Sequence, residues 1–371
     1  MKTMREREAI LQRIRELAET GEGAALATVI ATSGSTYRRP GARMLVTQGE
    51  SVGAVSAGCL EEEVRAVGLR VLQKGKPERL RFDTTEEMDK VAGTGLGCRG
   101  TIDVFVEPLT PERAQLYIAL QEALAEDRAC TLGMEIPGGR RVLLADGDPP
   151  LGELDEPPLR ERIASVGERL SPRRPTALLP HAGREIYVER VEPPLKLVVF
   201  GAGYDAQPLV KLAKELGFRV TVADPRPQYL TKERFPEADR LVPAHPSEAP
   251  EKVEVDGRTF LVILTHNYLQ DLELLGWALG TEAPYIGQIG PRARTEELLA
   301  DLERERGPLP PGAREKLYGP VGLDVGAETP EEIALSVLSE ILAVKNGRPG
   351  RSLRESRGPI HPPIHPQGQG P

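Results

Sequence analysis

Residues 197–224 constrain the fold more than any other part of this sequence. They begin with the apolar run Leu-Val-Val-Phe, pass through a glycine-rich turn and an apolar-periodic stretch, and end with Arg-Val-Thr-Val-Ala-Asp. This order of strand, turn, helix and strand is the one that a nucleotide-binding βαβ unit requires. Because the segment begins past the middle of a 371-residue chain, we expect a large, separate N-terminal module.

The second half of the chain continues this alternation, which predicts a parallel sheet covered on both faces. We expect a last helix from about 330 to 344 and strands at 197–200, 218–223, 239–242, 260–265 and 284–289. The paired prolines Pro193 and Pro194 indicate a stiff linker. The expected domains are an N-terminal domain at 1–194, a Rossmann-like domain at 195–346 and a disordered tail at 347–371.

The N-terminal part has a less regular pattern, which predicts a mixed α/β domain. Helices are expected at 5–20, after 57–59 up to about 72, and at 111–125; strands are expected at 25–32, 44–47, 51–56, 79–82, 101–106, 130–136 and 141–144. Residues 145–195 contain many prolines and show little periodicity, so no element is predicted there. The fold class is therefore α/β, with a Rossmann-like domain beside a separate mixed domain.

Composition and charge argue against several classes of protein. A net charge of −8 does not fit a general nucleic-acid binder, which needs a basic surface. No apolar run approaches the roughly 18 residues of a membrane span. The charged start of the chain does not match a signal peptide, and three cysteines do not form a disulfide framework. We expect a cytoplasmic protein without nucleic-acid or membrane partners.

The glycine-rich turn has the pattern G-x-G-x-x-A, formed by Gly201, Gly203 and Ala206. Gly201 allows the tight turn, Gly203 lets a phosphate approach the backbone, and Ala206 lets helix and strand pack closely. The N-terminus of the following helix favours an anion. Asp224, at the end of the second strand, is a candidate acceptor for a ribose hydroxyl.

Two charged residues keep a second interpretation of this turn open. Asp205 places a negative charge within the phosphate turn, and Arg226 is a candidate partner for an extra phosphate. A nucleotide-type fold that binds no dinucleotide therefore remains an alternative.

Thr265 and His266 follow a predicted strand, at the edge where ligands of open α/β sheets bind. His266 is a candidate acid, base or anion donor. The alternative is a helix cap made by Thr265 or Asn267, with an incidental histidine. After the next strand, Arg292 and Arg294 are candidates for an anion contact or for a solvated helix face.

The N-terminal candidates begin with Arg38, Arg39 and Arg43, which crowd a turn rich in Ser and Thr. Arginine forks and hydroxyl groups suit phosphate or carboxylate, and a solvated loop is the alternative. Gly58 and Cys59 lie where a strand is predicted to enter a helix. The N-terminus of a helix favours the thiolate form of a cysteine.

A second cysteine, Cys98, lies in another glycine-rich turn at 93–100. Together with Cys59 it suggests a site that handles sulfur or holds a metal, and core packing is the alternative. Without partner histidines nearby, the two make a poor zinc signature, and no metal site is predicted. Cys130 lies in a strand pattern and is expected in the core.

Several of these blocks resemble the XdhC/CoxI family, the accessory factors that mature xanthine dehydrogenase and related molybdenum hydroxylases. The longest block reads Gly-Ser-Thr-Tyr-Arg-Arg-Pro-Gly-Ala-Arg-Met at 34–44. The others lie at 58–61, 95–98, 200–203, 265–267, 286–287, 320–327 and 329–336. The blocks extend over both predicted domains, so the resemblance is more specific than the glycine turn by itself.

The resemblance implies a protein that carries the molybdenum cofactor as transient cargo, assists its sulfuration and helps insert it into an apo molybdenum hydroxylase. A cysteine desulfurase is a further implied partner, a homodimer is the expected assembly, and no catalytic residue is assigned. The implied binding residues are the candidates named above, with NAD(P) or another nucleotide as a further ligand. The alternatives are an NAD(P)-dependent oxidoreductase and a sulfur-transfer enzyme that uses Cys59.

Overall fold

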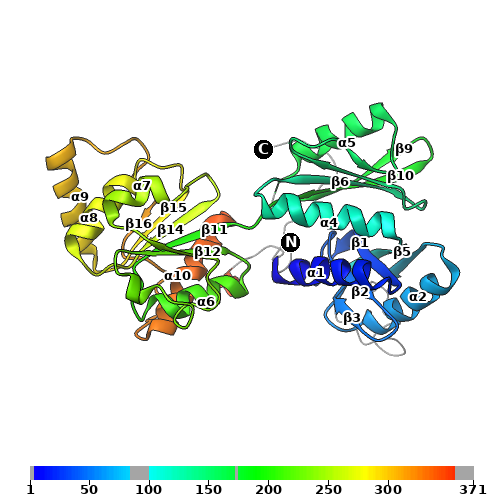
Figure 1. Ribbon diagram of the computed structural model, residues 1–371, viewed down its shortest axis with the longest axis horizontal. Coiled ribbons are helices and arrows are strands. Elements are labelled where there is room, and N and C mark those ends of the chain that lie inside the picture. The colour runs from blue at the N-terminus through cyan, green and yellow to red at the C-terminus, as the bar shows by residue number, and fades with distance from the viewer. Residues whose placement is uncertain (1–3, 84–99, 172–173, 356–371) are drawn as a thin grey trace. The chain divides into compact units, whose positions relative to one another are not determined.

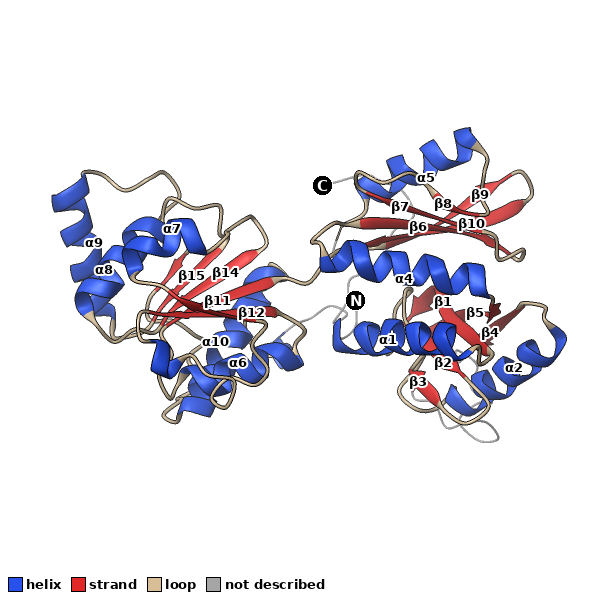
Figure 2. Ribbon diagram, viewed as in Figure 1, coloured by secondary structure: helices blue, strands red, loops and turns tan. Residues whose placement is uncertain are grey.

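The structure is a computed structural model that describes residues 4–83, 100–171 and 174–355 (Figure 1). The chain divides into two compact units, and the division falls between Pro193 and Pro194. The expected fold class is confirmed: the first unit is mixed α/β, and the second contains a parallel Rossmann-type sheet. Figure 2 shows the helices and strands of each unit.

The first unit contains two five-stranded antiparallel sheets. The first sheet has the order β3-β2-β1-β5-β4, with strands β1 (Ala24–Gly34), β2 (Arg43–Val46), β3 (Ser51–Gly53), β4 (Glu78–Asp83) and β5 (Gly100–Leu109). The second sheet has the order β8-β7-β6-β10-β9, with strands β6 (Cys130–Ile136), β7 (Arg141–Ala145), β8 (Leu151–Gly152), β9 (Thr176–His181) and β10 (Arg184–Val191).

The helices of this unit cover both sheets in layers. They are α1 (Met4–Thr20), α2 (Glu61–Lys74), α4 (Pro111–Ala125) and α5 (Pro157–Arg169). Helices α1 and α4 pack together between the two sheets, α2 covers the outer face of the first sheet, and α5 covers the outer face of the second (Figure 1). The two sheets also meet directly through a small cluster that includes Phe105 and Tyr187.

The sequence pattern explains these layers. Along β1, Leu26 faces α1 and α4, while Ala25 and Ala27 face α2. Both faces of the strand are therefore buried, because successive side chains of a strand point in opposite directions. Helix α4 begins where predicted: Pro111 occupies its first turn, and the Thr110 side chain accepts a hydrogen bond from the Arg113 N–H.

Residues 145–195 are the main correction to the sequence analysis. They contain strands β8, β9 and β10 and helix α5, although no element was predicted there. Strands β8 and β9 lie at the two edges of the second sheet. An edge strand tolerates proline such as Pro180, because one row of its N–H groups has no ladder partner. Pro157 and Pro158 instead begin α5, where proline is also tolerated, so the prolines of this segment do not mark an irregular region.

The second unit contains a six-stranded parallel sheet with the order β13-β12-β11-β14-β15-β16, which is the Rossmann order. Its strands are β11 (Lys196–Phe200), β12 (Arg219–Asp224), β13 (Arg240–Pro243), β14 (Thr259–Ile263), β15 (Tyr285–Gln288) and β16 (Leu317–Tyr318). The five predicted strands are present, and β16 was not predicted. Its helices are α6 (Ala206–Glu215), α7 (Ala249–Lys252), α8 (Tyr268–Ala278), α9 (Arg292–Arg306) and α10 (Pro330–Lys345).

Both faces of this parallel sheet are covered. Helices α6 and α10 pack on one face, and α7, α8 and α9 pack on the other (Figure 1). Along β11, Leu197 and Val199 point to the first face, whereas Val198 and Phe200 point to the second. Of the predicted tail, residues 347–355 are described and include a short 3-10 helix at Leu353–Glu355. The rest of the tail lies outside the described residues.

A buried ion pair joins the two sheets of the first unit. Arg141 on β7 is 1% exposed and binds the carboxylate of Glu107 on β5, which is also 1% exposed. Arg141 Nη1 also donates to the Tyr117 hydroxyl of α4 at 3.0 Å, and Arg113 pairs with Glu107 at 3.3 Å. The pair thus ties both sheets to the helix between them.

Replacing Glu107 by Ala leaves the Arg141 guanidinium buried without its carboxylate. We expect this change to destabilise the first unit by about 3–5 kcal/mol. Trp277, the single tryptophan of the chain, lies in α8 of the second unit, so its fluorescence during urea unfolding serves as a reporter of that unit. The unfolding of the first unit, followed by circular dichroism, should move to a lower urea concentration. The transition of the second unit, reported by Trp277, should stay in place.

The matched control is Glu78→Ala, which breaks the exposed pair with Arg70. This change should shift the unfolding transition of the first unit far less, because exposed ion pairs contribute little to stability. Equal shifts for the two variants would contradict the assigned role of the buried pair.

Candidate functional site

The glycine turn of the second unit connects β11 to α6. Gly201 has a φ of +110°, and a Cβ atom there would lie 2.4 Å from the Leu264 carbonyl oxygen. Only glycine fits such a position. Ala206 is fully buried as the first residue of α6. The predicted close approach of turn, helix and sheet is therefore present, and the turn lies at the carboxyl edge of the parallel strands.

Asp224 does not lie free to receive a ribose. Its Oδ2 accepts from the Ala202 N–H at 2.8 Å and from Arg226 Nη2 at 2.9 Å, while its Oδ1 accepts from the Arg226 N–H and Nε. Burial raises the pKa of Asp224, but the hydrogen bonds from Arg226 and Ala202 outweigh this effect and hold the pKa below its ordinary value. Asp224 therefore ties the second strand to the glycine turn.

Asp205 and His266 form a pair across the carboxyl edge of the sheet. The Nε2 atom of His266 lies 2.8 Å from Asp205 Oδ2, and His266 has a φ of +56°. Such a left-handed backbone is strained in a residue with a side chain. A Cβ atom on Gly203 would lie 2.5 Å from Asp205 Oδ1, so the carboxylate lies against the turn. A diphosphate entering this turn would meet a negative charge.

An arginine cluster beside the turn was only partly anticipated. Arg226 lies over the Tyr229 ring at 4.3 Å, and Arg234 lies over the same ring at 5.0 Å. Arg234 Nη2 also donates to the Ala202 carbonyl at 2.9 Å, and its Nε is buried without a hydrogen-bond partner. No sequence pattern pointed to Tyr229 or Arg234, because their position beside the glycine turn depends on how the segment after β12 folds back. The cluster offers cations to an anionic ligand.

One of the two helix caps considered at the edge near Thr265 is present, and the ligand-binding role of Thr265 and His266 stays a prediction. The Asn267 side chain caps α8 by accepting from the Gln270 N–H. Thr265 Oγ1 donates to the buried carboxylate of Asp271 at 2.5 Å, and Arg294 donates to the same carboxylate at 2.8 Å. Arg294 is therefore paired within the protein.

A small cavity of about 10 Å³ lies at this edge, among the carboxyl ends of β11, β12, β13 and β14. Its lining includes Phe200, Ala223, Ala244 and Thr265. A volume of this size holds about one water molecule. The edge thus has the place of a Rossmann ligand site, and this cavity by itself is smaller than a base or a nicotinamide.

In the first unit, the predicted arginine cluster does not gather around one anion. Arg38 forms a bidentate pair with Glu6, and its Nε donates to the Ser56 carbonyl at 3.3 Å. Arg43 forms a bidentate pair with Glu189, and both side chains are 10% exposed. Arg39 is partly exposed in the same loop. Two of the three predicted anion ligands are thus held by carboxylates of the protein.

Cys59 is exposed in a turn that precedes α2 by two residues. The Ser56 hydroxyl lies at the centre of this turn and accepts from the N–H groups of Gly58, Cys59 and Leu60 at 3.1–3.3 Å. The Cys59 thiol donates to the same hydroxyl at 3.4 Å. Gly58 has a φ of +113°, a conformation that favours glycine.

Glu61 holds this turn in place through Ser56. The sequence analysis did not identify Glu61 as a positioning residue. Its carboxylate accepts from the Ser56 hydroxyl at 2.5 Å and from the Ser56 N–H at 2.8 Å. Burial raises the pKa of Glu61, but the hydrogen bonds from Ser56 lower it more, so the net shift is downward. Cys98 lies outside the described residues, so its predicted relation to Cys59 stays a prediction.

No group of three His, Cys, Asp or Glu side chains among the described residues is arranged to hold a metal ion. No helix in the described ranges combines the length and the apolar character needed to cross a membrane.

Comparison with known proteins finds one family in both units. A family model described as "XdhC Rossmann domain" matches residues 197–341, and one described as "XdhC and CoxI family" matches residues 17–83. A Bacillus subtilis protein, named as a probable subunit of xanthine dehydrogenase, is 34% identical over 336 residues, which cover 89% of this chain and 95% of that protein.

Two further similarities extend along most of the chain. The Escherichia coli protein named "Molybdenum cofactor insertion chaperone PaoD" is 25% identical over 91% of this chain and 88% of its own length. A crystal structure described as a xanthine dehydrogenase from Bacillus halodurans is 29% identical and has a TM-score of 0.76. It covers 94% of this chain and 98% of its own.

Asp224→Asn should destabilise the second unit at neutral pH by about 1–3 kcal/mol, because it removes a buried acceptor from Arg226 and Ala202. The pKa of Asp224 is lowered on folding, so its contribution is present above the unfolded pKa of about 3.9 and is lost as the pH falls through the folded value. The difference between variant and wild type should therefore shrink in acid.

Urea unfolding followed by Trp277 fluorescence at neutral and acid pH measures this effect. Asp324→Asn, at an exposed carboxylate of the same unit, is the control and should stay close to wild type. A stability difference for Asp224→Asn that is absent at neutral pH or constant with pH would count against the assigned pairing.

Proposed function

The chain belongs to the XdhC and CoxI family, and from this premise we propose that it is an accessory protein for a molybdenum enzyme. On this proposal it binds the molybdenum cofactor as cargo, assists its sulfuration and helps insert it into an apo hydroxylase of the xanthine dehydrogenase type. The observation that carries the proposal is the similarity, along most of both chains, to a protein named as a molybdenum cofactor insertion chaperone.

The Cys59 turn supports a role in handling this cargo. The thiol is exposed, and the turn around it is held by three N–H donors to Ser56 and by the Glu61 carboxylate. A fixed backbone around an exposed thiol keeps the ligand atom in one place without burying it. Cys130, in contrast, is buried, and burial raises its pKa to about 11, so it is unsuited to bind cargo.

The second unit offers less support for hydride transfer from a dinucleotide than for binding an anionic group outside the glycine turn. Its strand order is that of dinucleotide-binding proteins. However, Asp205 lies against the phosphate turn and Asp224 is occupied by Arg226. We propose that Arg234, which lies over the Tyr229 ring and has an Nε without a hydrogen-bond partner, contacts an anionic part of the cargo. An NAD(P)-dependent oxidoreductase is the alternative.

The remaining assignments are proposals of the same kind. The partner is an apo molybdenum hydroxylase, with a cysteine desulfurase as the sulfur source. A homodimer and a cytoplasmic location stay predictions, and light scattering of the purified protein tests the first of them.

Retention of the cofactor is the direct test of the carrier role. Purified protein is mixed with released molybdenum cofactor under anaerobic conditions and passed through a gel-filtration column, with molybdenum measured in each fraction. We expect molybdenum to elute with the protein and to activate a separately prepared apo hydroxylase. Elution of all the cofactor at small-molecule volume would overturn the proposal.

Cys59→Ala should reduce this retention by about tenfold or more without unfolding the protein, because it removes the exposed thiol and leaves the Ser56–Glu61 turn. Cys130→Ala is the matched control: it also removes one thiol, should keep retention, and should lower thermal stability because a buried atom is lost. Equal retention by wild type and Cys59→Ala would remove Cys59 from the site.

Titration with NAD(H) and NADP(H), followed by nicotinamide fluorescence, separates the two functions. We expect weak binding by the wild type and tighter binding by Asp205→Asn, because the amide removes the negative charge beside Gly203. Tight binding by the wild type, with turnover of an alcohol or aldehyde, would favour the oxidoreductase.

A further inference from the structure

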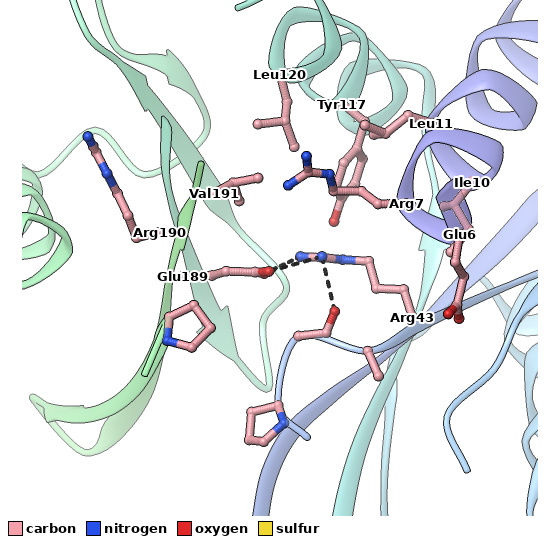
Figure 3. Close-up of a pocket in the computed structure, with 14 residues that line it drawn as sticks. Glu6, Arg7, Ile10, Leu11, Arg43, Tyr117, Leu120, Glu189, Arg190 and Val191 are labelled. Atoms are coloured by element: carbon pink, nitrogen blue, oxygen red, sulfur yellow. Dashed lines mark hydrogen bonds and ion pairs between the residues drawn. The ribbon is translucent and has the colours of Figure 1, made fainter. Parts of the chain in front are cut away.

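The first unit contains a cavity of about 50 Å³ that none of the functional assignments above uses (Figure 3). It lies where α1, the loop before β2, α4 and β10 meet. Charged groups and apolar walls line it together, and those that matter here are Arg7, Arg43, Tyr117, Leu120, Glu189 and Val191.

The charges lining this cavity do not balance. Arg43 is matched by Glu189 through two hydrogen bonds, and Tyr187 also contacts that carboxylate at 3.2 Å. The two other charged groups at the edge, Glu6 and Arg190, are paired outward, with Arg38 and with Asp146 and Glu192 respectively. One lining cation, Arg7, remains.

Arg7 has no carboxylate ligand among the described residues. Its Nη1 donates to the Glu192 carbonyl at 3.1 Å, and its Nε is buried without a hydrogen-bond partner. Arg43 Nε is unpartnered in the same way. Burial lowers the pKa of Arg7; Glu189 and Glu8 favour its charged form, and Arg43 opposes it. The guanidinium therefore lacks the compensation that an enclosed charge normally has.

The view in Figure 3 places this guanidinium in the space between Tyr117, Val191 and the Arg43–Glu189 pair. Leu120 and Val191 form apolar walls beside it. These apolar walls lower the local dielectric, which strengthens any charge interaction made there. The cavity thus has a cationic guanidinium among apolar walls.

We propose that this cavity binds a small oxyanion of the phosphate class, held by the guanidinium of Arg7. The size agrees with this ligand, because about 10–15 Å³ is needed for each water-sized group and the cavity has space for about four of them. The planar fork of arginine suits the oxygens of such an anion. The site is distinct from the Cys59 turn and does not depend on the proposed carrier function.

The site is connected to the Cys59 turn by a short series of contacts. Glu6 lies at the cavity edge and accepts from Arg38, and Arg38 Nε donates to the Ser56 carbonyl. Ser56 in turn holds the backbone around Cys59. An anion bound by Arg7 would therefore lie beside the Glu6–Arg38–Ser56 contacts that help to position the exposed thiol.

The test is calorimetric titration with inorganic phosphate at constant ionic strength, set with chloride, together with thermal unfolding in the same solutions. A small phosphate monoester, glycerol phosphate, shows whether the cavity also admits an esterified oxyanion, and acetate tests a planar one. We expect phosphate to bind the wild type and to raise its melting temperature, since a ligand of the native state stabilises it. No heat of binding and no shift in the wild type would overturn the proposal.

Arg7→Gln should weaken phosphate binding about ten- to hundredfold, because the amide removes the charge and the guanidinium fork. Arg15→Gln is the control: Arg15 lies on the same helix and also bridges α1 to α4, through Gln121 and Glu122 at the surface. It should bind phosphate as the wild type does.

Equal affinity in wild type and Arg7→Gln would show that Arg7 only braces α1 against β10, and would overturn the site. Arg7→Lys, which keeps the charge without the fork, provides a second variant in case Arg7→Gln fails to fold. Its affinity should lie between those of wild type and Arg7→Gln, and an affinity no lower than that of the wild type would contradict the role of the guanidinium fork.

Discussion

The central strands of all three sheets are buried on both faces, and this constraint governs the rest of the structure. A sheet of this kind must be covered twice, because each exposed apolar face would remain in contact with water. In the first unit the cover is provided by α2, by the α1–α4 layer and by α5; in the second unit it is provided by helices on both sides. The loops that enter α2, α6 and α8 carry half of the candidate residues, namely Gly58, Cys59, Gly201, Gly203, Thr265 and His266.

A second consequence of burial is the pairing of arginine with carboxylate throughout the molecule. Glu107, Glu189, Asp224 and Asp271 are enclosed by the packing of elements, and each is matched by an arginine fork. Such pairs hold loops and layers in register more than they add net stability. They also occupy several arginines that the sequence offered as anion ligands, and they leave Arg7 as the enclosed exception among the cavity residues.

The two units have different relations to the family assignment. The second unit has the Rossmann strand order and the glycine turn, but a carboxylate lies against the turn where a diphosphate would bind. The first unit holds an exposed cysteine in a rigid turn and a cationic cavity linked to it through Glu6 and Arg38. A carrier that holds its cargo without transforming it requires groups of this kind, namely fixed ligands and unbalanced charge, more than it requires acid–base pairs.

Local patterns in the sequence predicted the βαβ unit, the spans of most strands and of four helices, and the family, because periodicity and short motifs are local properties. The sequence did not predict β9 and β10, where prolines and charges hide an edge strand and its neighbour. Nor did it predict the partners of Arg43 and Asp205, which lie 146 and 61 residues away. Those pairings were decided by tertiary packing, because which carboxylate meets which cation depends on how distant elements are brought together.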